Sequence, residues 1–283
     1  MVTINKEIKA IIDSTCDLPP MPLVASRIVS LASDPNTDSK ILERAILADQ
    51  ALTAKILKLA NSSFYGCIRA INTIAAAIVL IGFKGIKSMA LAASLKSFYR
   101  RTDLTEKMLW EHSVGSAIAA HLLSKNLHCH VEDAFVGGLM HDIGKVILNT
   151  QLNETFSEIV QMAYNEDISF ADVERETLGF THAQIGGLMV KKWNLSRELE
   201  EAITYHHSLE DIDPLEVEVL KFAALLNLAD QICIYLGIGY RNPREDINFQ
   251  TLRSAQILGI SEPDILRIAE EVKVSYEAEK GDF

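Results

Sequence analysis

Apolar residues recur at helical spacing along most of the chain, and no alternating strand pattern is evident. In the first hundred residues, four apolar stripes predict short helices around residues 41–46, 52–59, 71–81 and 86–93. Asp38 and Ser39 are candidate caps of the first helix, and Gly82 is expected to stop the third. The proline-rich segment Leu18–Pro22 predicts an extended entry. A compact bundle is therefore expected up to about Arg100.

The second half has clearer helix boundaries. Thr181–Gln184 matches a capping box, which places His182 in the first turn of a helix. Another helix is expected between Ser169 and Gly179, and a short one from Ser196 to the His206–His207 corner. The sequence Asp-Pro-Leu-Glu at 213–216 predicts the start of a helix that runs to about residue 236. With an apolar tail at 257–269, the pattern predicts an all-α fold.

Side chains suited to metal binding occur in order along these predicted helices. They include five of the eight histidines, and the full series is His112, His141, Asp142, His182, His206, His207 and Asp230. Imidazole and carboxylate together suit Fe, Mn, Zn or Ni. Seven such groups exceed what one ion usually needs, which predicts two ions that share a carboxylate. Drawing ligands from several helices is a normal way to build a metal site inside a bundle.

The adjacent pair His141-Asp142 is expected at a helix end, where neighbouring side chains can turn toward one ion. Gly144 would then allow a tight turn, and Gly137-Gly138 would let another helix approach closely. The alternative is that the pair is a chance dipeptide exposed to solvent. The ordered set of seven favours metal binding.

The remaining histidines are expected to lie elsewhere. His121 follows His112 by nine positions, about half a turn away on a straight helix, so the two cannot share a face. His128 and His130 lie in a polar stretch, and all three are interpreted as surface or cap residues. Lys145 leaves two alternatives open. It is either an exposed lysine at a helix end or a cation that holds a phosphate oxygen.

Composition narrows the class of protein. The chain has 283 residues, of which 48% are hydrophobic and 23% charged, as in soluble globular proteins. The net charge of -11 argues against duplex nucleic acid as the main partner. Four scattered cysteines without CxxC spacing predict reduced, buried thiols. No signal-peptide pattern opens the chain, and its longest apolar stretch, Ile74–Phe83, is half the ~20 residues of a membrane span. We therefore expect a cytoplasmic protein.

Several motifs in the first hundred residues carry a family resemblance. They are Leu18–Pro22, Ala48–Leu57, Ala60–Ser62 and Ala77–Gly82. With them the chain resembles the HDOD family, the HD-related output domain of bacterial signalling proteins, within the HD metal-phosphohydrolase superfamily. One departure is Gln50, where family members usually have proline. The resemblance implies a two-lobed helical bundle. An HDOD domain would span 17–213, with halves 17–100 and 101–213, and a helical extension at 214–283 would complete the HD-like lobe.

The resemblance also assigns ligands. It implies that Asp142 bridges two divalent or mixed-valence ions. The superfamily pattern of His, His-Asp and Asp gives one ion His112, His141 and Asp230. The likeness to HD-GYP cyclic-dinucleotide phosphodiesterases gives the other ion His182, His206 and His207.

Two departures from the HD-GYP enzymes bear on function. Their Gly-Tyr-Pro loop is absent after His207, and Met108 stands where some of them place an extra acidic ligand. Cyclic-di-GMP is therefore in doubt as a substrate. Many HDOD domains have lost the metal ligands and act as interaction modules. The main expectation is thus a signalling module that binds a partner protein or a second copy of itself. The alternative is a metal-dependent phosphohydrolase acting on a nucleotide or cyclic dinucleotide, with Asp142 and Lys145 as catalytic residues.

Overall fold

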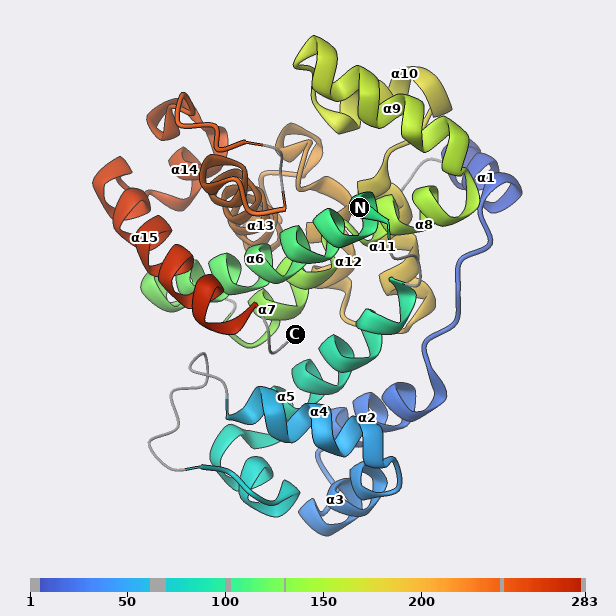
Figure 1. The fold of residues 1–283 in the computed structure, drawn as a ribbon, viewed down its shortest axis with the longest axis vertical. Coiled ribbons are helices and arrows are strands. Elements are labelled where there is room, and N and C mark those ends of the chain that lie inside the picture. The colour runs from blue at the N-terminus through green and yellow to red at the C-terminus, as the bar shows by residue number, and fades with distance from the viewer. Residues whose placement is uncertain (1–5, 62–69, 100–102, 130, 240–241, 281–283) are drawn as a thin grey trace.

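The computed structural model describes residues 6–61, 70–99, 103–129, 131–239 and 242–280. These residues form helices joined by turns and contain no strand. The predicted all-α fold is therefore confirmed. Figure 1 shows a smaller lobe built from α2 to α5 and a larger lobe that holds α1 and the helices after α5.

Four helices make the smaller lobe: α2 (Leu23–Ser33), α3 (Ser39–Leu47), α4 (Gln50–Ala60) and α5 (Ile74–Leu95). Asp38 caps α3 by accepting a hydrogen bond from the Lys40 amide, as its polar character predicted. Gly82 interrupts α5 with a positive φ of 77°, a backbone conformation that favours glycine. The predicted stop at Gly82 is thus a kink, because a second helical segment continues from it to Leu95.

The larger lobe begins with α1 (Lys6–Thr15), which precedes the smaller lobe in sequence. The extended segment after it is fixed to the larger lobe by side chains from two helices. Gln151 hydrogen-bonds to both the amide and the carbonyl of Asp17, at 2.7 and 2.6 Å, and the Trp193 indole donates to the Pro19 carbonyl at 3.0 Å. The chain then crosses to α2 (Figure 1).

The other helices of the larger lobe surround α6 and α13. Their bounds are α6 (Leu104–Leu127), α7 (Val131–Met140), α8 (Ile143–Gln151), α9 (Asn153–Glu166), α10 (Phe170–Leu178), α11 (His182–Lys192), α12 (Arg197–Tyr205), α13 (Val217–Leu236), α14 (Arg253–Leu258) and α15 (Glu262–Glu279). Short 3-10 turns occur at η2 (Lys96–Phe98), η3 (Leu209–Asp211) and η4 (Phe249–Thr251). The helix α6 packs against α7, α13 and α15.

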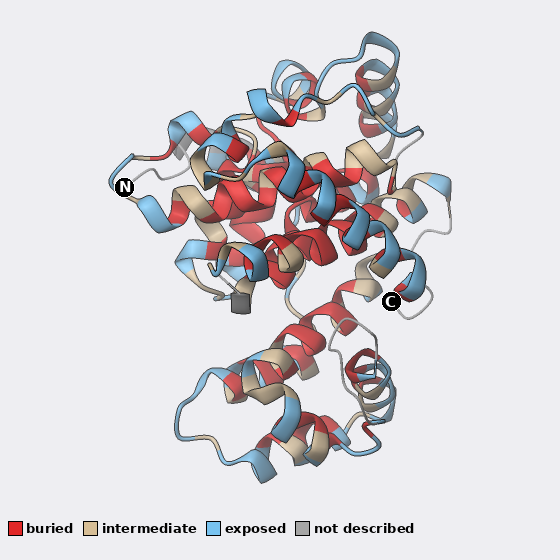
Figure 2. Cartoon of the chain, turned by 90° about the vertical axis from the view of Figure 1, so that its left-hand side faces the viewer, coloured by how far each residue is buried: buried red, intermediate tan, exposed pale blue. Residues whose placement is uncertain are grey.

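Most buried apolar residues of both lobes form one continuous cluster, and a small second cluster lies between α9 and α10. Figure 2 shows the buried positions concentrated in the larger lobe. The helix α5 joins the lobes and packs against α7. Because α13 and α15 also pack on α6, the segment after residue 213 contributes to the same core. The domain boundaries at residues 100 and 213 stay a prediction.

Most predicted helix ends in the second half agree with the structure. Ser169, Thr181 and Ser196 are the N-caps of α10, α11 and α12, and Thr181 and Gln184 form the expected capping box. The start of α13 was wrong by three residues. Asp213 instead organises a turn, because its side chain accepts a hydrogen bond from the Leu215 amide at 2.9 Å.

Two glycines allow close contact between helices. A Cβ on Gly138 would lie 2.3 Å from the Ser116 carbonyl oxygen of α6, as the expectation of close approach required. Gly144 was expected to allow a tight turn, and the structure shows a different role. It lies inside α8 without a positive φ, and a Cβ there would lie 2.0 Å from the His182 carbonyl oxygen. Gly144 therefore permits α8 to contact the start of α11, and it does not make a turn.

Two segments of the described chain, Ile74–Phe98 and Val217–Leu236, are long and apolar enough to cross a membrane by length and composition. The helix at 74 thus extends beyond the apolar stretch counted in the sequence. Within these windows 44% and 61% of the residues are buried inside the fold. Burial of this kind is consistent with core helices of a soluble protein.

Among the cysteines, Cys16 and Cys233 are buried and Cys129 is half-buried, all as free thiols. Burial raises the pKa of the Cys16 thiol. Cys67 lies outside the described residues.

Gly144→Ala should destabilise the protein by at least about 2 kcal/mol, because a new Cβ would overlap backbone that cannot move aside. The matched control is Gly259→Ala, whose Cβ would meet open space. It should cost only about 1 kcal/mol, from its positive φ. Urea denaturation of both variants measures the difference. Equal losses would contradict the packing role of Gly144.

Candidate metal centre

The structure brings all seven predicted side chains together inside the larger lobe. His112 lies in the middle of α6, and His141 and Asp142 lie between α7 and α8. The others lie at the start of α11, at the end of α12 and within α13: His182, His206, His207 and Asp230. Six of the seven are buried, with at most 4% exposure, and His207 is half-buried. The alternative of a solvent-exposed His-Asp dipeptide is therefore wrong.

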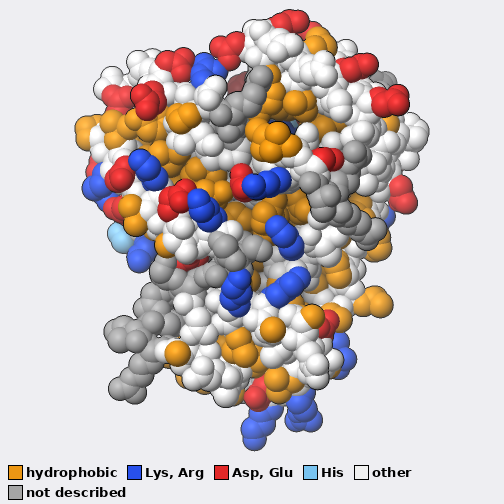
Figure 3. All heavy atoms as spheres, in the orientation of Figure 1, with side chains coloured by type: hydrophobic (Ala, Val, Ile, Leu, Met, Phe, Trp, Pro, Cys, Tyr) orange, Lys and Arg blue, Asp and Glu red, His pale blue; other side chains and the backbone are white. Residues whose placement is uncertain are grey.

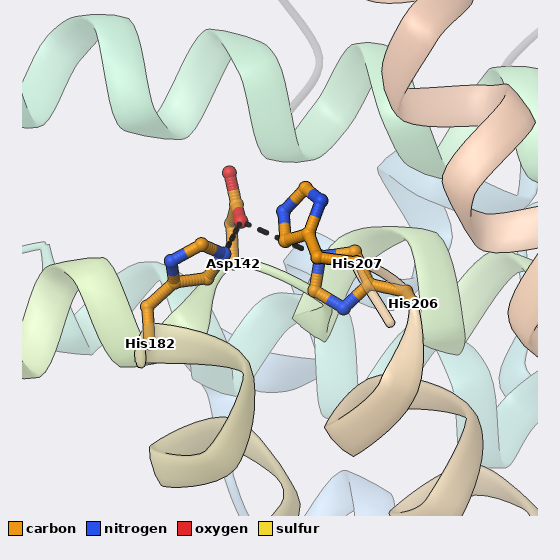
Figure 4. A group of neighbouring side chains, drawn as sticks. All are labelled: Asp142, His182, His206 and His207. Atoms are coloured by element: carbon orange, nitrogen blue, oxygen red, sulfur yellow. Dashed lines mark ion pairs between the residues drawn. The ribbon is translucent and has the colours of Figure 1, made fainter. Parts of the chain in front are cut away.

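Their ligand atoms form two groups that meet at Asp142. One group is Asp142, His182, His206 and His207, and the other is His112, His141 and Asp230. Within each group the atoms lie within 4.8 Å of one another. Figure 4 shows the first group, with the Asp142 carboxylate beside the His182 and His206 rings.

Asp142 has an oxygen on each side. Its Oδ1 lies 3.0 Å from His182 Nε2 and 4.0 Å from His206 Nε2. Its Oδ2 lies 3.5 Å from His141 Nε2 and 3.7 Å from His112 Nε2. A carboxylate with one oxygen toward each histidine group has the arrangement needed to bridge two ions.

Hydrogen bonds at the far side of the rings fix their orientation. The Nδ1–H groups of His141 and His206 each donate to a carbonyl three residues earlier, on Gly138 and Ile203, at 2.7 Å. These carbonyls lie in the last turns of α7 and α12, where helix carbonyls lack internal partners. His112 Nδ1 likewise contacts the Ile238 carbonyl at 3.1 Å. Because a carbonyl only accepts, each Nδ1 is the donor, and each Nε2 is left to face the centre.

Several of these inward nitrogens have no hydrogen-bond partner among the described residues. The Nε2 atoms of His141, His206 and His207 are buried and make no hydrogen bond there. Buried polar atoms are nearly always paired, so three convergent exceptions call for a ligand. A metal ion accepts imidazole lone pairs in this geometry, so the residues present fit a metal.

The electrostatics of four of the ligands favour a cation, whereas carboxylates beside His112 and His182 raise the pKa of those two rings despite their burial. Burial lowers the pKa of His206 well below its ordinary value and that of His207 to about 3, so both rings are neutral. Burial would raise the pKa of Asp142 and Asp230. Nearby histidines outweigh burial, and both carboxyls have pKa values below the ordinary one. Neutral imidazoles and ionised carboxylates are the forms that bind metals.

Lys145 belongs to the centre and is not the exposed lysine that one alternative expected. It is buried, with Nζ 2.7 Å from Asp142 Oδ2 and 4.7 Å from the centroid of the Phe170 ring. Burial lowers its pKa, but Asp142, Asp230 and Glu174 together outweigh burial and raise the pKa above the ordinary value. Lys145 is therefore a fixed positive charge beside the bridging carboxylate.

A pocket of about 150 Å³ lies over this centre. Its lining includes His112, Asp142, Lys145, His207 and Asp230, together with residues of α6, α9, α10 and α13. A small molecule can therefore reach Lys145 and both ligand groups at once.

Sequence reasoning missed Glu174. This fully buried residue of α10 accepts hydrogen bonds from the His182 amide at 2.7 Å and from His182 Nδ1 at 2.6 Å. A carboxylate behind a histidine raises its basicity and fixes its ring. No sequence signal identifies Glu174, because it precedes His182 by eight residues and lies on a different helix.

Two of the three excluded histidines, His121 and His128, lie outside the two groups. His128 ends α6 in a left-handed conformation, as a cap residue. His121 is half-buried, and burial lowers its pKa to about 4. His130 lies outside the described residues.

Comparison with known proteins assigns the family. The HDOD domain profile matches residues 18–209. The chain belongs to the HDOD family. An uncharacterised protein of Treponema pallidum is 24% identical over 278 residues, which cover 96% of this chain and 52% of that protein. This HDOD chain thus spans about half the length of that relative.

Solved structures show the same fold. An HDOD domain protein of unknown function from Geobacter sulfurreducens superimposes with a TM-score of 0.80 at 25% identity, covering 96% of this chain and 95% of that one. A candidate phosphohydrolase from Shewanella amazonensis gives a TM-score of 0.74 at 21% identity, covering 99% of both chains. The fold is therefore shared with experimentally determined structures, one of which is an HDOD domain protein.

Adding Mn²⁺ or Zn²⁺ to metal-free protein should raise the temperature of unfolding, since a ligand that binds only the folded state stabilises it. The gain is about 2.7 kcal/mol when the free metal is a hundredfold above its dissociation constant. Asp142→Ala should abolish the gain, because its carboxylate faces both groups. His121→Ala is the control and should keep it. Calorimetry with and without metal tests this, and an unchanged gain in Asp142→Ala would contradict the site.

Proposed function

We propose that this HDOD protein is a metal-dependent phosphohydrolase whose centre holds two ions. The observation that carries the proposal is the position of Asp142. It presents one oxygen to each histidine group, with Lys145 beside it on the pocket lining. A vestigial site would not need the same carboxylate to face both groups. This geometry favours the phosphohydrolase over the module role that the missing Gly-Tyr-Pro loop suggested.

The ligand sets follow the two groups. His112, His141 and Asp230 would hold one ion, and His182, His206 and His207 the other, with Asp142 shared. Mixed imidazole and carboxylate ligation suits Fe, Mn, Ni or Zn, in divalent or mixed-valence form.

Each part of the centre has a chemical task. The ions, when bound, would supply Lewis acidity and an activated water. Lys145 would hold a phosphoryl oxygen and offset the negative charge that develops during hydrolysis. Because Lys145 is buried, its positive charge acts more strongly there than it would in solvent. The backbone carbonyls behind His141 and His206 keep the ligands from rotating, so little reorganisation is needed.

A signalling role is the second candidate. The smaller lobe exposes large apolar side chains at Leu23, Val79 and Leu80, which are 89%, 80% and 64% accessible and do not line the pocket. Exposed apolar groups of this kind are available for contact with a partner protein or a second copy of the chain. We propose a cytoplasmic setting for both roles.

Metal content and hydrolysis measured on the same sample test the proposal. Protein purified without chelator, or reconstituted with Mn²⁺, should hold about two ions per chain. It should hydrolyse a generic phosphate ester such as p-nitrophenyl phosphate. His182→Ala should retain about one ion, because only one ligand group loses a member. Absence of metal after reconstitution would reject the site, and full metal content without hydrolysis of any ester would favour the signalling role.

Lys145→Met should keep its metal but lower kcat by roughly a hundredfold to a thousandfold, the usual cost of removing one preorganised group that stabilises developing charge. The control is Lys191→Met, an exposed lysine paired with Glu200 away from the pocket. Steady-state kinetics with parallel elemental analysis separate loss of chemistry from loss of metal. An unchanged kcat in Lys145→Met would remove Lys145 from the mechanism.

A further inference from the structure

The walls of the pocket above the metal centre are mostly apolar. Met108, Leu109, Phe156, Val160, Phe170 and Ile234 line it, and they come from α6, α9, α10 and α13. The aromatic rings of α9 and α10 pack together, with 6.5 Å between the centroids of Phe156 and Phe170 and 5.7 Å between Tyr164 and Phe170. Figure 3 shows hydrophobic side chains gathered on this face of the larger lobe, where the surface is hollowed.

Positive charge is confined to one end of the pocket. Lys145 is the only lysine or arginine among the described lining residues, and it lies beside Asp142. A single cation next to the metal ligands suits one phosphoryl group. A second phosphate in this pocket would lie against apolar walls. The adjoining pocket, which shares Tyr164, Gln231 and Ile234, contains Arg244, but that guanidinium is already paired with Asp167 and Asp246.

Hydrogen-bonding capacity away from the metal centre is small. Thr105, Tyr164, Ser169 and Gln231 are the neutral polar lining residues in the described part of the chain. Ser169 is already committed, because its hydroxyl donates to Asp172 at 2.7 Å as part of the α10 cap. A ribose or nucleobase held between these walls would leave polar groups without hydrogen-bond partners, which weakens binding.

The volume sets the size of the occupant. The pocket measures about 150 Å³, which matches an engineered apolar protein cavity of about 150 Å³ that binds benzene. The pocket therefore has room for a compact organic group, such as one aromatic ring, next to the metal ligands.

We infer that the pocket binds a phosphate monoester whose organic group is compact and apolar, about the size of one aromatic ring. The phosphoryl end lies at Lys145 and the metal ligands, and the organic end packs against Phe170, Val160 and Ile234. This inference rests on the proposed function, and it assigns Phe170 and Val160 as specificity-determining residues. Mononucleotides and cyclic dinucleotides are poor ligands, because their polar parts meet apolar walls.

The test compares two phosphonates that cannot be hydrolysed, measured by titration calorimetry on the metal-loaded protein. Phenylphosphonate should bind at least about tenfold more tightly than methylphosphonate, since burying an aromatic ring adds that much affinity. ADP and cyclic-di-GMP should bind more weakly than phenylphosphonate.

Variants of the pocket residues test which side chains cause the preference for phenylphosphonate. Phe170→Ala should weaken phenylphosphonate more than methylphosphonate and so remove most of the advantage of phenylphosphonate; any loss common to both ligands reports the contact of the ring with Lys145. Val160→Phe fills the same space from α9 and should also weaken phenylphosphonate selectively, which keeps the test decisive if Phe170→Ala does not fold. Met162→Ala is the matched control, because Met162 lies on α9, is exposed and does not line the pocket.

The outcomes separate this inference from the proposed function. Equal affinity for the two phosphonates would overturn the apolar subsite and leave the phosphohydrolase proposal standing. Tighter binding of ADP or cyclic-di-GMP would overturn the ligand class. If protein holding two ions bound neither phosphonate, the proposed function itself would fail, and the inference with it.

Discussion

Asp142 lies buried between two groups of histidines, and this contact constrains the helices around it. A carboxylate buried in a core of low dielectric needs a charged or hydrogen-bonding partner at each of its oxygens. Lys145 provides one from α8 and His182 the other from α11. These helices must therefore approach closely, which Gly144 permits by lacking a Cβ where α8 meets the His182 backbone. The packing of the larger lobe and the composition of the centre are thus linked.

Helix ends do much of the positioning. The final carbonyls of α7 and α12 would be unpaired in the core, and His141 and His206 satisfy them with Nδ1 while turning Nε2 inward. Glu174 serves His182 in the same way from α10. These three ligands are therefore held by groups whose own burial requires the contact. A centre built in this way is rigid before any ion arrives.

The two lobes divide the properties of the protein. The metal centre and the apolar pocket belong to the larger lobe, whereas Leu23, Val79 and Leu80 expose apolar surface on the smaller one. A continuous core and the kinked helix α5 join them. Membership of the HDOD family agrees with this architecture. Chemistry at one lobe and contact with a partner at the other are compatible in one chain.

We could predict the all-α fold, most helix starts and the seven candidate ligands from the amino-acid pattern, because periodicity and caps such as Thr181 and Ser169 act over a few residues. The pattern misplaced the start of α13, since the turn at Asp213 competes with the helix signal. Only the tertiary structure decided that Lys145 is buried, that Glu174 supports His182 and that Phe170 faces the pocket. Those contacts join residues on different helices, and local spacing carries no information about which helices meet.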